Sequence, residues 1–468
     1  MNSQFTDADV AVAEATAPLS VAASAPAISY QTALWIARLG RVGALWLPIS
    51  TICLAHSTNS WAALQATILF VVCWKAALRR SYSDASVTVW TIGSAVPAAV
   101  GAVTGALLVT PLAVWAPGLS ITGRTLLELT VAVFLTSTVW EAMVARSLAA
   151  RRRILVVGTA AGGVGLLEDV SLAPELPFEV IGVVDDERGS DHVAGVPLLG
   201  TVQDLSAIIL EHKPQIVVLT DDRSRAEAFS HLLELGHIGF SVVGLPEFYE
   251  YAFGRLPVRA LTPLWFMGIL HLYRRPYSQA SKRAFDLGVA LVAGLLVAPI
   301  LPILWLAVRR TGPAIFKQVR LGAGGKPFVI YKFRTMRVDA EPNGAVWAAE
   351  HDPRVTKLGC FMRKSRLDEL PQLWNVLKGE MSIVGPRPER PEFVAELESE
   401  VPFWGRRHLV KPGITGWAQV RRGYTSDAAG TGDKLSYDLW YLRHRSLVVD
   451  LAICAKTVST LLTGSGAR

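Results

Sequence analysis

The sequence predicts a membrane protein that combines a helical membrane part with α/β parts, and three observations indicate this class. Hydrophobic residues make up 51% of the 468 residues and charged residues only 18%, which is far more apolar than an average soluble domain. Four apolar segments of near-spanning length occupy residues 31–150. Further along, apolar strands alternate with helical patterns, and one more apolar run has cations at both of its ends.

The first 30 residues are rich in Ala, Ser, Thr and acidic residues, and no basic residue precedes the first apolar run. A signal peptide would begin with a positive region, so this composition predicts a disordered tail over 1–30.

The next segment, 31–150, predicts a four-helix transmembrane anchor. Spanning helices need about 20 apolar residues, and the four runs lie at about 34–56, 61–78, 86–110 and 124–148. Cations follow the second run and the fourth run, at Lys75, Arg79, Arg80, Arg146 and 151–153. The positive-inside rule then places both ends of the bundle in the cytoplasm. Few charges lie within the runs, although Arg38 and Arg41 fall in the first, so we expect an anchor and not a pore.

Residues 151–250 predict a Rossmann-like α/β domain. An apolar strand from Arg153 enters a Gly-rich turn at Gly158, and further strands are expected at 178–184, 215–219 and 240–243. The turn departs from the G-x-G-x-x-G fingerprint, although an acidic pair, Asp185 and Asp186, follows at a suitable distance. Nucleotide binding and a contact scaffold are both open. We favour the scaffold, with a homodimer as the expected assembly.

Aromatic, basic and proline residues over 251–280 predict a linker that lies along the membrane surface. The apolar run 287–308 follows, with cations directly before and after it and Pro299 near its middle. A proline inside a helix removes a hydrogen bond and bends the chain. We therefore expect a re-entrant helix broken at Pro299, whose two ends face the cytoplasm. The alternative is a fifth full span, which would place residues 309–468 outside the cell.

Two adjacent carboxylates, Asp368 and Glu369, follow a cluster of three cations at Arg363, Lys364 and Arg366. Paired acids among cations suit a site that handles phosphate and a divalent metal. The alternative is a solvated first helical turn, where the helix dipole favours acidic residues.

From about 281 to 465 the chain resembles the bacterial sugar transferases, the monotopic polyprenyl-phosphate phosphoglycosyl transferases. The resemblance is based on several motifs in the family's order, at 328–336, 366–380, 381–388 and 411–420. The layout of the whole chain is similar to the large members of the undecaprenyl-phosphate galactose or glucose phosphotransferase type. This resemblance implies a mostly helical α/β catalytic domain over 281–468. Small members of the family often have Ser-Pro at the helix break, where this chain has Ala298-Pro299.

The resemblance also implies a reaction and a location for the enzyme in the cell. Hexose-1-phosphate passes from a UDP-sugar to undecaprenyl phosphate and UMP leaves, which is the first membrane step of O-antigen, capsule or exopolysaccharide synthesis. The enzyme is then expected in the bacterial inner membrane, multi-pass, with its catalytic domain on the cytoplasmic face. By motif position Asp368 would be the nucleophile that forms a covalent phosphosugar intermediate. Asp368 and Glu369 would be the ligands of Mg²⁺.

Five more residues match family positions. The resemblance implies contacts with substrate phosphates for Lys332, Arg334, Arg363 and Arg387, and a cation- or metal-orienting role for Asp438. For each cation, the alternative is a surface residue near anionic lipid.

The net charge of +7 indicates anionic partners. Neither zinc-finger spacing nor an aromatic-basic RNA motif occurs, so membrane lipid and phosphorylated substrates are preferred and no nucleic acid is expected. Two alternatives to the transferase remain: a membrane-bound nucleotide-sugar dehydratase or epimerase, and a non-catalytic scaffold for glycan assembly. The dehydratase would need an intact fingerprint and a Tyr-x-x-x-Lys pair, and neither occurs between 151 and 250.

Overall fold

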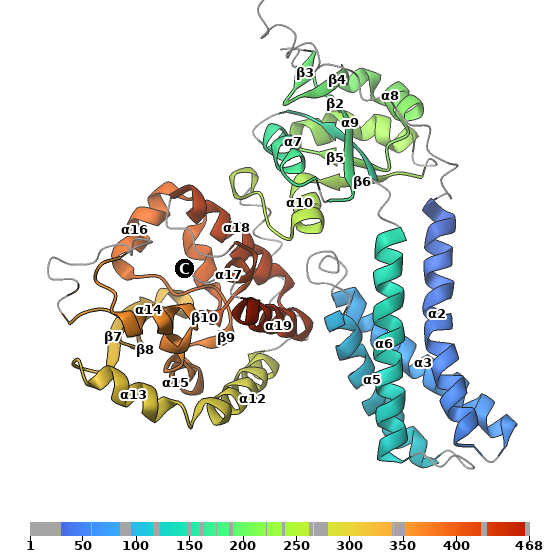
Figure 1. Cartoon of the computed structure of the whole chain (residues 1–468). Coiled ribbons are helices and arrows are strands. Elements are labelled where there is room, and N and C mark those ends of the chain that lie inside the picture. The colour runs from blue at the N-terminus through green and yellow to red at the C-terminus, as the bar shows by residue number, and fades with distance from the viewer. Residues whose placement is uncertain are drawn as a thin grey trace, which may run out of the picture.

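The computed structural model combines a bundle of long helices, a parallel α/β sheet and a larger C-terminal α/β part (Figure 1). It describes residues 30–57, 59–84, 95–115, 122–147, 152–159, 162–174, 176–186, 191–220, 222–235, 239–261, 265, 279–338, 340, 352–422 and 428–463. The predicted disordered tail lies outside these residues up to position 29, as does most of the predicted linker, 266–278.

The described residues of the N-terminal part form the helices α2 (Tyr30–Ala55), α3 (Ser60–Asp84), α5 (Ala95–Trp115) and α6 (Gly123–Ser147). The α3 helix packs on α2 and α5, and α6 packs on the same two helices. Small residues allow the close approach of α3 and α5, because a Cβ at Gly105 would lie 2.2 Å from the Trp74 ring. The Trp74 indole then donates to the Ala102 carbonyl oxygen across this contact, at 3.0 Å.

Within the described residues, Ser60–Leu78 and Gly123–Val144 are long and apolar enough to cross a membrane. The apolar stretches of the other two helices, Leu39–Ala55 and Ala95–Pro111, are shorter. Arg41, the charge within the first predicted span, donates to both carboxylate oxygens of Glu141 on α6, at 2.5 and 3.0 Å. Pairing offsets the cost of a charge among apolar helices. Four full spans stay a prediction.

A six-stranded sheet follows, in the order β3-β4-β2-β1-β5-β6, and only β3 runs antiparallel to its neighbour. The strands are β1 (Arg152–Val157), β2 (Phe178–Val184), β3 (His192–Val193), β4 (Val196–Gly200), β5 (Ile216–Leu219) and β6 (Ser241–Gly244). Helices α7 (Gly163–Ser171), α8 (Leu205–His212), α9 (Asp222–Glu234) and α10 (Leu245–Phe253) complete this part. Side chains alternate along β1 between two apolar clusters, one for each face of the sheet.

The turn after β1 and the acidic pair after β2 form hydrogen bonds within the chain. The Asp185 carboxylate accepts from the Thr159 backbone N–H at 2.5 Å and from its hydroxyl, and Asp186 accepts from the Val202 N–H at 2.9 Å. Gly163 permits close helix–strand packing, since a Cβ there would lie 2.4 Å from the Gly158 carbonyl oxygen. These contacts occupy the acidic side chains that a nucleotide ribose would need, which favours the scaffold interpretation.

Residues 250–261 connect the sheet to the C-terminal part. Leu256, Val258 and Leu261 belong to its apolar core, and the indole N–H of Trp417 donates to the Gly254 carbonyl oxygen at 2.7 Å. This described piece of the predicted linker is therefore packed against protein.

The C-terminal part begins with α12 (Gln279–Val297) and α13 (Leu301–Arg309), which meet at an angle of 66°. Pro299 lies in the break between them, where the Ile300 N–H donates to the Val297 carbonyl oxygen at 2.9 Å. One face of this pair is apolar and exposed, at Leu291, Leu295, Leu296, Ile303 and Leu306. Such a face is typical of a helix pair that inserts into a lipid layer.

The remaining strands are β7 (Ile315–Leu321) and β8 (Pro327–Phe333), which form a hairpin, and β9 (Ser382–Val384) and β10 (Gly413–Thr415), which form a parallel pair. The α-helices are α14 (Lys357–Lys364), α15 (Gln372–Lys378), α16 (Pro391–Glu400), α17 (Trp417–Arg422), α18 (Ala428–His444) and α19 (Leu447–Thr463). Among the described residues, this part also has three short 3₁₀ helices, η4 (Ala323–Gly325), η5 (Leu367–Glu369) and η6 (Trp404–Leu409). The core centres on Trp417 and Trp440, whose rings stack at 5.0 Å.

Candidate active site

The two adjacent carboxylates lie on η5, one sharp turn after α14. Arg366 makes that turn in the left-handed region, with φ of 58°, an uncommon conformation for a residue with a Cβ. Its carbonyl oxygen accepts from the Glu369 N–H at 3.2 Å and starts the 3₁₀ turn. Asp368 and Glu369 are both buried, so they do not form the solvated helical turn of the alternative interpretation.

Glu369 is surrounded by cations from three segments. Its Oε1 lies 2.9 Å from Arg387 Nη2, 3.3 Å from Lys332 Nζ and 3.9 Å from Arg366 Nη1. Burial alone would raise the pKa of this carboxyl, but the positive charges of Arg387 and Lys332 outweigh it and hold the pKa well below the usual range. Glu369 is therefore a fixed anion that holds the three cations together.

Asp368 has a different environment. Its Oδ1 is buried and has no hydrogen-bond partner among the residues that the structure describes. Burial, and next the negative charge of Glu369, raise the pKa of Asp368, while Lys332, Arg387 and Arg363 oppose that rise. A buried carboxylate oxygen without a partner is rare in folded proteins and requires an explanation. An oxygen kept available for a reacting atom provides one.

Lys332 projects from β8, and the hydrogen bonds of Asn375 fix the position of that strand. The Asn375 side chain accepts from the Tyr331 N–H at 3.2 Å and donates to the Val329 carbonyl oxygen at 2.7 Å. Burial lowers the pKa of Lys332, and the charge of Glu369 partly restores it. Asn375 thus ties α15, which follows the two acids, to the strand that carries Lys332.

Arg363 lies on α14 and is oriented by Thr335, whose hydroxyl accepts from Arg363 Nε at 2.9 Å. This helix approaches the end of β8 very closely, because a Cβ at Gly359 would lie 2.0 Å from the Thr335 carbonyl oxygen. Glycine at this position thus sets the distance of Arg363 from the rest of the site.

Arg334 faces a different set of groups. Its guanidinium donates to the carbonyl oxygens of Pro313, Met336 and Val308, at 2.7, 3.0 and 3.2 Å, and to the Thr311 hydroxyl at 2.9 Å. These bonds join the end of β8 to the end of α13. Its predicted contact with substrate phosphate stays a prediction, and the arrangement favours a structural role.

Arg387 is presented by a tightly packed turn after β9. Three glycines meet there, because a Cβ at Gly413 would lie 2.1 Å from the Gly385 N and one at Gly416 2.3 Å from the Gly385 O. The Gly413 N–H then donates to the Pro386 carbonyl oxygen at 2.9 Å. Only glycine allows two backbone segments to approach this closely.

Asp438 lies behind this turn and pairs with Arg407, a residue that sequence reasoning missed. Asp438 Oδ2 lies 2.7 Å from Arg407 Nη2, and both side chains are only 2% exposed. The same guanidinium donates to the Arg387 carbonyl oxygen at 3.0 Å, so Asp438 orients a cation that supports Arg387. Burial raises the pKa of Asp438 to about 6, although Arg407 opposes the rise. No sequence signal distinguishes Arg407 from the exposed Arg406 beside it.

Among the residues that the structure describes, Asp368 and Glu369 are the carboxylates at this site that could hold a metal ion. No group of three or more His, Cys, Asp and Glu side chains that could hold one occurs among the described residues. Mg²⁺ commonly takes one or two protein carboxylates and completes its shell with water and substrate phosphates. The unpartnered Asp368 Oδ1 fits that type of binding.

The arrangement as a whole suits an anionic substrate. Lys332, Arg366 and Arg387 converge on one carboxylate, so positive charge is in excess around Asp368. Guanidinium groups bind phosphate oxygens with two parallel hydrogen bonds. A carboxylate can attack a phosphorus atom held by such cations.

Comparisons with known proteins place this chain among sugar-phosphate transferases. Residues 277–464 match the family model described as bacterial sugar transferase. The UDP-N-acetylgalactosamine-undecaprenyl-phosphate N-acetylgalactosaminephosphotransferase of Aeromonas hydrophila is 46% identical over 189 residues, which is 40% of this chain and 45% of that protein. The UDP-glucose:undecaprenyl-phosphate glucose-1-phosphate transferase of Escherichia coli strain K12 is 37% identical over 318 residues, which is 66% of this chain and 67% of that protein. The exopolysaccharide production protein PSS of Rhizobium leguminosarum is 41% identical over 190 residues, or 39% of this chain and 95% of that protein.

Proposed function

The chain belongs to the bacterial sugar transferase family and is an enzyme of the phosphoglycosyl transferase kind, and on that premise we propose that it transfers hexose-1-phosphate from a UDP-sugar to undecaprenyl phosphate and releases UMP. The observation that best supports this proposal is the contrast between the two acids. Glu369 is held by three cations, whereas Asp368 keeps a buried oxygen without a partner.

In the first step, an Asp368 oxygen attacks the β-phosphorus of the UDP-sugar. The new oxygen–phosphorus bond forms as the bond from that phosphorus to the bridging oxygen breaks, and UMP leaves with the electron pair. In the second step, a phosphate oxygen of undecaprenyl phosphate attacks the same phosphorus and displaces the Asp368 carboxylate. The products are the lipid-linked diphosphosugar and the free enzyme.

The surrounding residues bind and orient the phosphates. Lys332 and Arg387 already face the acids and would contact the non-bridging oxygens, with Arg363 beyond them. Arg407 and Asp438 do not touch the substrate in this scheme, because they support the Arg387 turn from behind. Asp368 and Glu369 would hold Mg²⁺. When bound, that ion would neutralise the negative charge of the diphosphate.

We infer that the site lies at the cytoplasmic face of the bacterial inner membrane. Cations lie near the start of α12, at Lys282 and Arg283, and at the end of α13, at Arg309 and Arg310, which suits a re-entrant helix that returns to the cytoplasm. Undecaprenyl phosphate in the same membrane could then reach Asp368. The step would begin O-antigen, capsule or exopolysaccharide synthesis.

The topology can be tested with a native cysteine. Cys360 is exposed and lies beyond Arg310, so it reports on the side that holds residues 309–468. In spheroplasts, a membrane-impermeant maleimide should label Cys360 only after permeabilisation, with Cys360→Ser as the background control. Labelling before permeabilisation would favour the fifth full span.

The catalytic test is UMP release by the full-length enzyme in lipid nanodiscs. Asp368→Asn keeps the side-chain shape but removes the nucleophile, so turnover should be lost. Substantial turnover by this variant would overturn the assignment. The related enzymes named above differ in their sugars, so a panel of UDP-glucose, UDP-galactose and their N-acetylated forms would identify the donor as well.

We further propose that the sheet of β1–β6 is a contact module and that the enzyme is a homodimer. The contact role is supported by the hydrogen bonds that the Asp185 and Asp186 carboxylates accept from their own chain, because these bonds occupy the groups that a nucleotide would need. Native mass spectrometry from nanodiscs should show two copies, and tight NAD binding by the full chain would contradict the contact role.

A further inference from the structure

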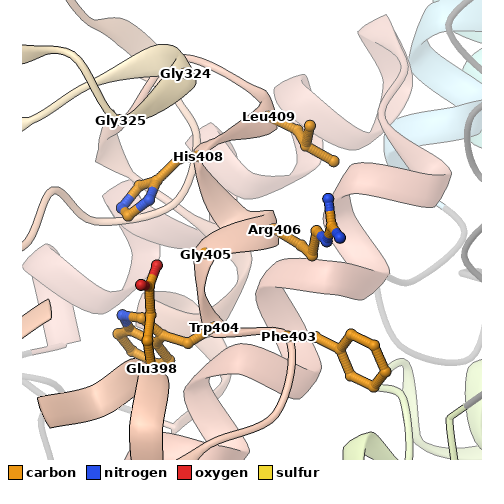
Figure 2. Close-up of a pocket in the computed structure, with 9 residues that line it drawn as sticks. All are labelled: Gly324, Gly325, Glu398, Phe403, Trp404, Gly405, Arg406, His408 and Leu409. Carbon is orange, nitrogen blue, oxygen red and sulfur yellow. The ribbon is translucent and has the colours of Figure 1, made fainter. Parts of the chain in front are cut away.

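A cavity lies in the C-terminal part, away from the two acids. It has a volume of about 510 Å³ and is formed by η6, by α16 and by the tip of the β7–β8 hairpin at Gly324 and Gly325 (Figure 2). Lys332 lies near the other end of the hairpin, about 17 Å or more away at the usual rise of a strand. This volume is in the range of small-molecule sites. The proposed transfer reaction does not use it.

The first sign of a ligand is a buried donor without an acceptor. Trp404 lines the cavity and is only 1% exposed, and its indole N–H has no hydrogen-bond partner among the described residues. One face of its ring lies against the guanidinium of Arg407, at 4.4 Å. A buried indole N–H normally finds a partner, so a ligand hydroxyl in the cavity would complete this site.

The second sign is the backbone beside Trp404. Phe403 adopts the left-handed region with φ of 67°, a strained conformation for a bulky residue. Such strain persists only where the surrounding structure fixes it, and it is concentrated at binding and catalytic sites. Here it turns the chain directly at the cavity wall, where Figure 2 shows the Phe403 ring.

Gly405 makes room for a carboxylate at the same wall. A Cβ on Gly405 would lie 2.6 Å from the Oε1 of Glu398, an exposed residue of α16 that lines the cavity. Glycine therefore lets the Glu398 carboxylate occupy its position beside η6, and Figure 2 shows Glu398 among the residues that line the cavity. The cavity thus offers an ionised acceptor and a buried donor in one place.

The remaining polar groups extend this pattern. Arg406 contributes further donors. Burial, together with the positive charge of Arg407, lowers the pKa of His408 to about 4, so its ring is neutral at physiological pH and offers one donor and one acceptor. Phe403 and Trp404 add aromatic surface.

Mixed donors and acceptors beside aromatic rings match the hydroxyl groups and C–H face of a sugar. The charges of Glu398 and Arg406 offset each other, so the lining carries no net positive charge that would favour a phosphate. We propose that this cavity is a binding site for a neutral, hydroxyl-rich sugar, separate from the site around Asp368. The sugar could be free or part of a larger glycan or nucleotide sugar, and the test separates these sources.

The test is saturation-transfer NMR on the full-length protein in lipid nanodiscs, prepared without glycoside detergents. The probes are D-glucose, D-galactose, N-acetylglucosamine and N-acetylgalactosamine. At least one should give ring-proton signals that persist when saturating UDP fills the site around Asp368. When a UDP-sugar replaces the free sugar, signals that UDP abolishes would mean that the cavity takes the free sugar. Signals that persist with UDP would mean that it also takes the nucleotide-linked form.

Two variants make the test specific. Gly405→Ala should displace the Glu398 carboxylate, and Glu398→Gln should remove its charge without changing its shape. Each should weaken binding by about tenfold or more, the loss expected for a hydrogen bond to a charged group. Glu396→Gln, an exposed acid on the same helix outside the cavity, is the matched control and should bind as the wild type does.

Melting temperatures close to that of the wild type would establish that the variants are folded. The proposal is overturned if no sugar gives a signal in the presence of UDP. It is also overturned if the signal is unchanged in Gly405→Ala and Glu398→Gln, or if inorganic phosphate displaces the sugar, which would indicate an anion site.

Discussion

The buried pair of Arg407 and Asp438 allows a quantitative prediction, because each is only 2% exposed and Arg407 also supports the Arg387 turn. We consider the variant Arg407→Leu, which replaces the guanidinium with an apolar side chain. It leaves the Asp438 carboxylate buried without its cation and removes the hydrogen bond to the Arg387 carbonyl oxygen. Glu389, 3.5 Å from Arg407, loses a partner as well.

Removing one partner of a buried ion pair costs about 3–5 kcal/mol of stability, because the other charge stays buried. At about 2–4 °C per kcal/mol for a part of this size, the melting temperature should fall by about 6–20 °C. The double variant Arg407→Leu/Asp438→Asn leaves no buried carboxylate at this position. It should therefore be more stable than Arg407→Leu alone, and the full cycle of wild type, both single variants and the double variant measures the coupling of the pair.

The assay is thermal unfolding in nanodiscs at several pH values. The pKa of Asp438 is raised to about 6 in the folded protein, so its contribution to stability is present at low pH and is lost as the pH rises through 6. The wild type should accordingly gain stability from this group between pH 7 and pH 5, and Asp438→Asn should remove that gain. In Arg407→Leu the gain should begin at higher pH, because the cation that opposes the rise in pKa is gone.

Equal melting temperatures for Arg407→Leu and the wild type would refute the reasoning, since they would mean that the pair contributes nothing net. A positioning role also predicts that Arg407→Leu raises the KM for the UDP-sugar, because Arg387 loses its support. A change in stability without any change in KM would limit the pair to a structural role.

Three further predictions concern the active site. Burial and the charge of Glu369 raise the pKa of Asp368, and the attack needs the ionised carboxylate. On acidification, kcat/KM should therefore begin to fall at a pH above about 3.9, the pKa of an ordinary aspartate. A fall in kcat/KM with an apparent pKa at that ordinary value would contradict this prediction. Gly359→Ala should cost about 1–3 kcal/mol and reduce activity, because its Cβ would meet the Thr335 carbonyl oxygen at 2.0 Å; an unchanged melting temperature would show that α14 can move away freely. Arg387→Gln should raise the KM for UDP-sugar and also lower the melting temperature, because buried Glu369 loses its nearest cation. Arg334→Gln should lower the melting temperature and leave KM nearly unchanged, and a raised KM in that variant would restore Arg334 as a phosphate ligand.

The regular parts of the fold were predictable because local patterns determine them. The strand expected at 178–184 is β2 (Phe178–Val184), because an apolar run bounded by turn residues indicates a buried strand from the sequence alone. The short strands β3 and β4 were missed, because His192–Val193 and Val196–Gly200 carry little periodicity. The bend between α12 and α13 lies at the proline that local chemistry indicates.

The candidate site was predictable only where a motif marks it. The family resemblance distinguishes Asp368 from Glu369 by position, whereas the structure distinguishes them by their neighbours. Arg334 and Arg387 look alike in sequence, yet carbonyl oxygens surround the first and the second faces a carboxylate. Arg407 was missed because its burial depends on contacts with Arg387 and Asp438, which lie 20 or more residues away in the chain.

The most direct measurement of the central claim is a single turnover without the lipid acceptor. Full-length enzyme mixed with UDP-sugar and no undecaprenyl phosphate should release UMP in a burst of at most one equivalent. Rapid acid quenching and peptide mass spectrometry should then find the mass of a hexose phosphate on the peptide that contains Asp368. Added undecaprenyl phosphate should discharge that peptide and yield the lipid-linked product. Lipid loading at the normal rate with no burst, or with the added mass on Glu369, would contradict Asp368 as the nucleophile.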